Sequence, residues 1–302
     1  MVSLITSAGT GASTIWIHDK NGDRPLSEES YSFNPQFSRD GKRVFYLASQ
    51  RPRAVMIMTG ELWSVSLDSA ERRRLPGAGD IVRFAVEPDR NQVLFLAVGP
   101  DQRNALWLAP LDGREAPRRL ADDVSTFRVS QQEIIFAARE GTLTYVYLMG
   151  FDGTNRRKAL PEPVVGPGLH AVSPDRKWLI VEDRIAIEGA QNPLVLYPLG
   201  GDTSSRIPVC AGCLVSWVFG GRYLQVRFGN SPERPTYLAP VPPGEILPAL
   251  FRTGRLVSEA EVAKLPGVRV FPQDAPAFGA DLDTYVYTKS TVHRNLFRIP
   301  LE

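Results

Sequence analysis

Short apolar runs separated by tight polar turns recur along the whole chain. Each copy has an apolar residue, a turn rich in Ser, Pro, Asp and Gly, and then a run of β-branched or aromatic residues. The fullest copies are 35–47 and 170–181; others lie at 84–96, 127–136, 216–226 and 277–287. Apolar runs this short, bounded by turn residues, predict antiparallel strands rather than helices.

The apolar residue before each turn gives the period of the repeat. Successive copies are separated by 49, 43, 43, 45 and 61 residues. These anchor residues are Phe37, Val86, Val129, Val172, Trp217 and Phe278. A period of about 40–50 residues is typical of propeller blades made of four short strands.

A second half-repeat follows each anchor. It has an apolar strand, a turn that often carries Asp-Gly, and a closing strand rich in Arg and Leu, most clearly at 106–120. Asp-Gly between apolar runs is a strong hairpin signal, because glycine tolerates a positive φ. The sequence therefore predicts an all-β propeller of four-stranded antiparallel blades, as a single domain over 1–302. The count of third-position strands gives seven blades, with six as the alternative.

The two ends and one insertion depart from the repeat. The first blade lacks its opening strand and the last its closing one, so a strand from one end is expected to complete the other, within a longer polypeptide. Ser258 and Glu261 have capping-box spacing and predict a short helical insertion near 258–265, as a loop or a partner-binding element. Gly9 and Gly11 predict a hairpin tip.

Composition narrows the function classes. The 302 residues contain 35 Lys+Arg and 33 Asp+Glu, which gives a net charge of +2. This balance argues against binding to nucleic acid or to an anionic membrane through bulk charge. No run approaches the ~20 apolar residues of a membrane span, and the first residues do not form a signal peptide.

Catalytic and metal-binding motifs are not found in the sequence. The three histidines lie in different repeats, without Cys, Asp or Glu at ligand spacing, and Gly-x-Ser-x-Gly and phosphate-loop motifs are missing. The sequence thus predicts no catalytic residues, no metal and no cofactor.

Propellers bind along their central channel, and four residues lie on or beside first strands by repeat register. These channel candidates are Asn34, Arg83, Arg128 and His170. They would serve a protein or peptide partner, or a small ligand in the central channel. A one-residue slip in register would turn each side chain to the other face.

Cys210 and Cys213 are the only cysteines. They fit a local disulfide or a pair of reduced core thiols. Half of a zinc site would need a second cysteine pair that the chain does not have.

The cores at 37–42 and 173–178, with their Asp-Gly hairpins, resemble the TolB-type, WD40-like β-propeller repeat. More narrowly, 106–113, 210–217, 259–267 and 291–300 are similar to the C-terminal propeller region of acidobacterial-type serine/threonine protein kinases and related winged-helix regulators. The resemblance covers essentially the whole chain. One blade departs from it, because Gln131-Gln132 replaces Pro-Asp-Gly in a shortened turn.

The resemblance implies a non-catalytic sensor or scaffold domain that binds a protein or ligand and is linked to bacterial signalling. Kinase motifs are missing here, so any kinase activity would belong to an upstream domain. The alternatives are a stand-alone periplasmic TolB-like scaffold and, less favoured, a propeller enzyme or the propeller half of a serine peptidase. The resemblance also implies an extracytoplasmic location, although the residues alone leave the compartment open.

Overall fold

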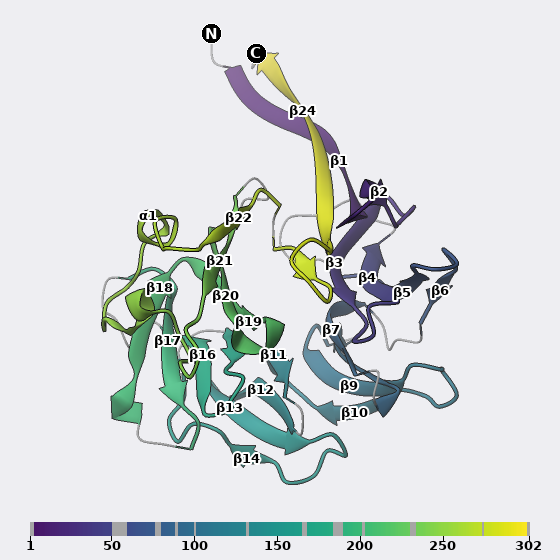
Figure 1. Cartoon of the computed structure of the whole chain (residues 1–302). Helices are drawn as coiled ribbons and strands as arrows, with labels where there is room; N and C mark the ends of the chain where they lie inside the picture. Colours follow the sequence, from purple (N-terminus) through teal and green to yellow (C-terminus); the bar gives the residue numbers. More distant parts are fainter. Residues whose placement is uncertain are drawn as a thin grey trace. The chain divides into compact units, whose positions relative to one another are not determined.

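The computed structural model describes residues 3–49, 59–75, 80–87, 90–99, 101–130, 133–164, 168–183, 190–200, 203–229, 234–273 and 275–300. The chain divides into two compact units (Figure 1). Unit 1 is Met1–Leu75 with Ala277–Glu302, and unit 2 is Pro76–Pro276. A single domain over 1–302 stays a prediction.

Unit 2 contains four antiparallel sheets of four strands, each formed by consecutive strands of the chain. The first blade has β7 (Ile81–Glu87), β8 (Gln92–Val98), β9 (Asn104–Pro110) and β10 (Arg118–Ala121). The second has β11 (Val124–Val129), β12 (Glu133–Glu140), β13 (Leu143–Gly150) and β14 (Arg157–Lys158). The third has β15 (Leu169–Val172), β16 (Trp178–Glu182), β17 (Pro193–Pro198) and β18 (Ile207–Ala211). The fourth has β19 (Cys213–Val218), β20 (Tyr223–Phe228), β21 (Thr236–Pro240) and β22 (Arg269–Phe271).

In the first two blades of unit 2 the second strand is a continuous buried run. Five consecutive residues are buried in both β8 and β12, including Phe95 and Phe136, which are fully buried. An uninterrupted apolar run of this length suits a strand covered on both faces. The fourth strands of these two blades are polar instead: Arg118 and Arg119 of β10 are exposed, and charge on an edge strand discourages pairing with other chains.

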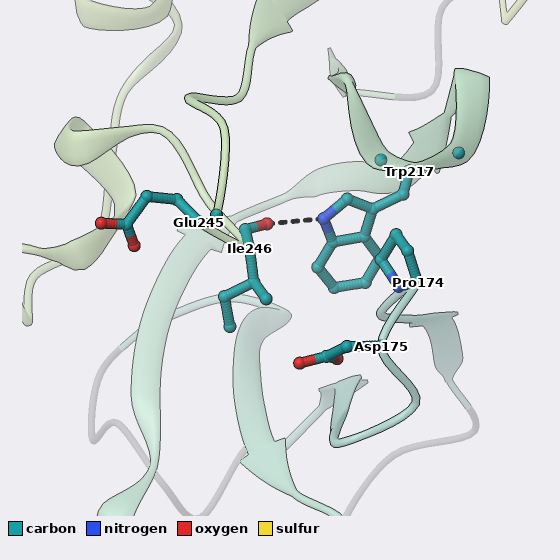
Figure 2. A pocket seen from close by; sticks show the side chains of 8 residues that line it. Pro174, Asp175, Trp217, Glu245 and Ile246 are labelled. Atoms are coloured by element: carbon teal, nitrogen blue, oxygen red, sulfur yellow. Dashed lines mark hydrogen bonds between the residues drawn. The ribbon is translucent and has the colours of Figure 1, made fainter.

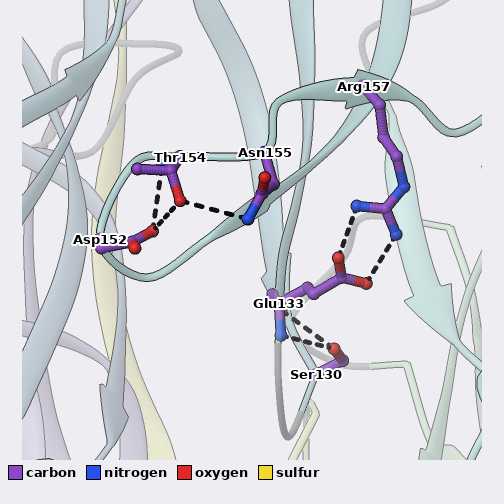
Figure 3. Close-up of polar contacts among 6 residues, drawn as sticks. All are labelled: Ser130, Glu133, Asp152, Thr154, Asn155 and Arg157. Atoms are coloured by element: carbon purple, nitrogen blue, oxygen red, sulfur yellow. Dashed lines mark hydrogen bonds and ion pairs between the residues drawn. The ribbon is translucent and has the colours of Figure 1, made fainter.

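The Asp-Gly turns form through side-chain caps. In the turn after β13, the Asp152 carboxylate accepts hydrogen bonds from the backbone N–H and the hydroxyl of Thr154, at 2.9 and 2.8 Å (Figure 3). Gly153 has a φ of 86°, which a side chain would strain. Beside this turn, Arg157 of β14 forms a two-pronged ion pair with Glu133 of β12, at 2.6 and 3.1 Å.

The insertion of unit 2 packs into the core but is less helical than predicted. It contains a 3-10 helix, η4 (Ala249–Arg252), and α1 (Glu259–Val262), whose residues Phe251 and Val262 are fully buried. The expected helix over 258–265 is therefore wrong in extent, because α1 has four residues and no helix in the described parts reaches seven. After α1, Leu265 N–H donates to the Val262 carbonyl, which is the tighter 3-10 pattern, and Pro266 follows.

Unit 1 is one sheet of eight strands. Its N-terminal strands are β1 (Ser3–Asp19), β2 (Gly22–Pro25), β3 (Tyr31–Phe37), β4 (Arg43–Ser49), β5 (Glu61–Ser66) and β6 (Arg72–Arg74). Its C-terminal strands are β23 (Ala277–Phe278) and β24 (Tyr285–Pro300). β1 pairs with β24 from Ser3 opposite Pro300 to His18 opposite Tyr285, so both ends of the chain share this sheet.

Two expectations about the ends are wrong. The described residues form four four-stranded blades, not seven or six, because the remaining strands merge into the eight-stranded sheet, where the pair Ser13–Tyr31 joins β1 to β3. Gly9 and Gly11 are not a hairpin tip, because both lie inside β1 and pair with residues of β24. In the described part of the chain, no helix has the length and apolar character needed to cross a membrane.

Candidate functional site

The first strands of the four blades of unit 2 lie next to one another. β7 contacts β11, β11 contacts β15, and β15 contacts β19, whereas each fourth strand lies at the opposite edge of its sheet. We call β7, β11, β15 and β19 the inner strands. Side chains from different blades can meet here.

Three of the inner strands contain a β-bulge. The pairing register shifts between Ile81 and Arg83 in β7, and similar shifts occur near the start of β11 and of β15. β19 pairs with β20 without a shift. A bulge adds one residue to a strand and changes the direction of nearby side chains. In β15 the added residue is His170, between Leu169 and Ala171.

Arg128 is held in place by backbone and hydroxyl oxygens of the inner strands. Its Nε donates to the His170 carbonyl, and its Nη1 donates to the Phe127 carbonyl at 2.8 Å and to the Thr126 hydroxyl at 3.4 Å. Arg128 pairs with the third residue of its neighbouring strand, Ile135 of β12. In the other three blades this register position holds small residues: Ala85, Ala171 and Ser216.

Arg83 contributes a second positive charge to the same place. Its side chain is exposed to solvent, yet the surrounding protein lowers its pKa. Burial also lowers the pKa of Arg128, and the charge of Arg83 on the neighbouring strand β7 lowers it further. An arginine side chain remains protonated at neutral pH even so.

His170 completes this group, which we call the inner basic cluster (Arg83, Arg128 and His170). Burial lowers its pKa to about 4, with smaller contributions from the charges of Arg128 and Arg83. At pH 7 the imidazole is therefore neutral, with one donor and one acceptor nitrogen. A Cβ at Gly168 would lie 2.8 Å from His170 Nε2, so this glycine leaves room for the ring.

Asn34, the fourth channel candidate, belongs to unit 1. It is exposed, has a φ of 56°, and lies in the bulge of β3 between Phe33 and Gln36. The cluster that the structure brings together thus consists of Arg83, Arg128 and His170.

Cys210 and Cys213 form a disulfide, with their Cα atoms 6.1 Å apart. Cys210 ends the third blade in β18 and Cys213 begins the fourth in β19, so the bond links two neighbouring blades. Both residues are buried in the same apolar cluster as Phe251 and Val262. The pair is structural in this arrangement.

A small pocket lies beside the inner strands of the third and fourth blades. Its volume is about 220 Å³, and Trp217, Pro174, Asp175, Glu245 and Ile246 contribute to its lining (Figure 2). Trp217 Nε1 donates to the Ile246 carbonyl at 2.6 Å, which fixes the indole. Ligand pockets usually have about 300–1,000 Å³, so this one is small even for a small organic ligand. Sequence reasoning missed the pocket and identified only Trp217, as a repeat anchor.

The chemistry available at the inner strands is positive charge and hydrogen-bond donation. In the described parts of the chain, no group of three or more His, Cys, Asp or Glu residues is placed to hold a metal ion. The three members of the cluster come from three blades, so its geometry depends on the folded arrangement of unit 2.

Comparisons with solved structures identify the fold. A protein described as a TolB from Agrobacterium tumefaciens aligns with a TM-score of 0.62 at 14% identity, over 94% of this chain and 99% of that one. TolB from Acinetobacter baumannii aligns with 0.52 at 14% identity, over 76% of this chain and 61% of the other. A chain from a nidogen/laminin complex aligns with 0.54 at 11% identity, over 93% and 98%. No protein-family model and no curated protein matches the sequence.

These alignments show that the chain has an all-β propeller fold, similar to that of the TolB structures. The resemblance seen in the repeat cores is confirmed to that extent. At 11–14% identity the likeness concerns the fold alone, and the kinase-associated resemblance is not shown by it.

Proposed function

We propose that this chain is a non-catalytic β-propeller scaffold that binds a protein or peptide partner at the inner strands of unit 2. The observation that carries the proposal is the meeting of three blades at these residues: Arg128 donates to the His170 carbonyl, and β7, which holds Arg83, contacts β11. These groups bind and orient, and they do not include a nucleophile paired with a base.

The structural neighbours support this choice. One of the similar propellers was solved in a nidogen/laminin complex, which is a protein–protein assembly. A function belongs to a site rather than to a fold, so the proposal depends on the inner basic cluster.

The test is selection from a random dodecapeptide library with the folded full chain, followed by footprinting with diethyl pyrocarbonate, which modifies neutral imidazole. We expect enriched peptides to slow the modification of His170. As the control, modification of His18, which lies in β1 of unit 1, should not change. Failure to enrich any peptide, or enrichment without protection of His170, would contradict the proposal.

Linkage to bacterial signalling through a kinase is a finer prediction, which rests on the sequence resemblance alone. Its test is the mass and peptide sequence of the native protein from its source cells. Upstream kinase or winged-helix peptides would support it. A native protein of about 33.4 kDa would instead favour the stand-alone periplasmic scaffold.

A further inference from the structure

Arg83 and Arg128 of the inner basic cluster differ from several arginines on outer strands and loops. Three of these pair with carboxylates: Arg157 with Glu133, Arg103 with Asp123, and Arg234 with Glu259. Neither Arg83 nor Arg128 forms an ion pair with a carboxylate of the described residues. The effect of Arg83 on Arg128 is repulsive instead.

We propose that Arg83 and Arg128 form a binding site for a carboxylate group of a peptide partner, with His170 beside it. This inference rests on the proposed function and specifies its chemistry. The carboxylate would lie between the two guanidinium groups and would convert their repulsion into attraction to a shared anion.

Arg128 offers a fixed donor for such a ligand. Its Nε and Nη1 are used by protein oxygens, which set the orientation of the guanidinium plane. Its Nη2 makes no hydrogen bond within the described residues and is not among the buried unpaired atoms, so solvent reaches it. Because the plane is already oriented, a ligand oxygen at Nη2 is bound without further loss of side-chain freedom.

Arg83 offers a mobile donor. Its guanidinium has no protein hydrogen bond within the described residues, and its side chain is exposed. A free guanidinium can give two parallel N–H bonds to one carboxylate. Arg128, which is already oriented, and Arg83, which has no protein hydrogen bond within the described residues, can thus bind one anionic group together.

The energetics favour an anion at this place. Two like charges beside each other repel unless an opposite charge compensates them, and the charge of Arg83 already lowers the pKa of Arg128. Phosphate sites commonly use helix N-termini or turns with converging N–H groups. The two guanidinium groups lie on inner strands, which are sheet edges without a helix N-terminus among the described residues, so this arrangement favours a carboxylate over a phosphate.

The experiment is NMR of the full chain labelled with ¹⁵N-arginine, which reports the Nε–Hε signal of each arginine. The probes are the peptide acetyl-Gly-Gly-Glu-Gly-Gly-amide, its Gln counterpart, and inorganic phosphate. Assignment uses Arg83→Gln and Arg128→Gln, and Arg114→Gln is the matched control, because Arg114 is an exposed loop residue paired with Asp112.

We expect the Glu peptide to shift the signals of Arg83 and Arg128 in a saturable way, and to leave that of Arg114 unchanged. Its affinity should fall at least tenfold in Arg83→Gln and in Arg128→Gln, and stay the same in Arg114→Gln. Arg83→Gln keeps the test valid if Arg128→Gln does not fold, because Arg83 makes no hydrogen bond that the fold needs.

Three results would overturn the inference. The Gln peptide could shift the same signals equally, the two arginine variants could bind as wild type does, or phosphate could bind more than tenfold tighter than the Glu peptide. If library peptides still protect His170 in those cases, the proposed scaffold function is supported and only the proposed carboxylate site is wrong. If the Glu peptide binds but no library peptide protects His170, the peptide partner is wrong and the site binds a small carboxylate.

Discussion

β15 and β19 are neighbouring inner strands, each the first strand of its blade, but they differ in register and in what their side chains contact. β15 is bulged at His170, accepts a hydrogen bond from Arg128 of β11, and is part of the inner basic cluster. β19 has an unbroken register, begins at the disulfide and places Trp217 against the Ile246 carbonyl.

The difference shows how a repeated scaffold separates binding from stability. A bulge releases one residue from the ladder, and a charged or polar side chain can then face the inner space. A regular strand keeps alternate side chains in the core, as Cys213 and Val215 of β19 do, both nearly fully buried. We therefore expect changes to the polar side chains Arg128 of β11 and His170 of β15 to alter ligand binding, and changes to core-facing residues of any inner strand to alter stability.

The largest effect should come from a buried register position that occurs in both the bulged strand β11 and the regular strand β19. Phe127 of β11 and Val215 of β19 occupy the same register position, and both are buried. Phe127→Ala should lower the free energy of unfolding by about 3–5 kcal/mol, because it leaves a large cavity, and Val215→Ala by about 2 kcal/mol. Urea unfolding measures both, and equal losses would show that β11 and β19 do not differ in core packing.

The second prediction concerns pH and the bulged strand. The His170 pKa is about 4 in the folded protein and about 6.5 when unfolded, so between these values the unfolded chain binds the proton. Stability should therefore fall as pH drops from 6.5 to 4, by at most about 3 kcal/mol from this residue. The groups that face His170 are Arg83 and Arg128 on the inner strands, and Glu182 of β16 lies beside Gly168.

The measurement is urea unfolding at several pH values for wild type and His170→Gln. Glutamine does not titrate, so the variant should lose that part of the pH dependence that belongs to His170. If wild type and His170→Gln have parallel pH profiles between 6.5 and 4, the low pKa is wrong.

The third prediction concerns the disulfide at β19. Its loop is short, so replacing both Cys210 and Cys213 by alanine should cost only about 2 kcal/mol. Hydrogen exchange should accelerate in β18 and β19 and remain unchanged in β11 and β12. A uniform increase across unit 2 would show that the bond does not act locally between the two blades.

Much of this fold follows from local sequence patterns. Four of the anchors lie in the inner strands of unit 2: Val86, Val129, Val172 and Trp217. Phe37 lies in β3 of unit 1. These strands were predictable because the alternation of apolar residues is a property of each strand alone. The blade count does not follow in this way. It depends on which distant strands pair, and β1 pairs with β24 across nearly the whole sequence.

The candidate site was predictable as a set of positions and not as an arrangement. Repeat register places Arg83, Arg128 and His170 on inner strands, but the bulge that releases His170 and the hydrogen bond from Arg128 to the His170 carbonyl depend on contacts between strands. Whether Arg83 and Arg128 meet a carboxylate of the described residues likewise depends on how the three blades are arranged. Gly9 and Gly11 show the same limit, since the pairing partner β24 overrides their local preference for a turn.

The smallest predicted effect contrasts the turns that follow β15 and β19. Arg176 has a φ of 58° in the first turn, and Gly220 has a φ of 65° in the second. The left-handed region strains residues with a side chain and not glycine. Arg176→Gly should thus stabilise the protein by about 0.5–1 kcal/mol, and Gly220→Ala should destabilise it by about 1 kcal/mol.

Both positions test backbone conformation with little change in packing. A Cβ at Gly220 would meet no atom within 4 Å, and Arg176 is exposed. Gly221 is unsuitable as the comparison, because a Cβ there would lie 2.5 Å from Pro174 Cγ and add a steric clash. Opposite signs in thermal unfolding would show that the two turns share one backbone requirement, which β15 meets with a strained arginine and β19 with glycine. The same sign for both substitutions would contradict that equivalence.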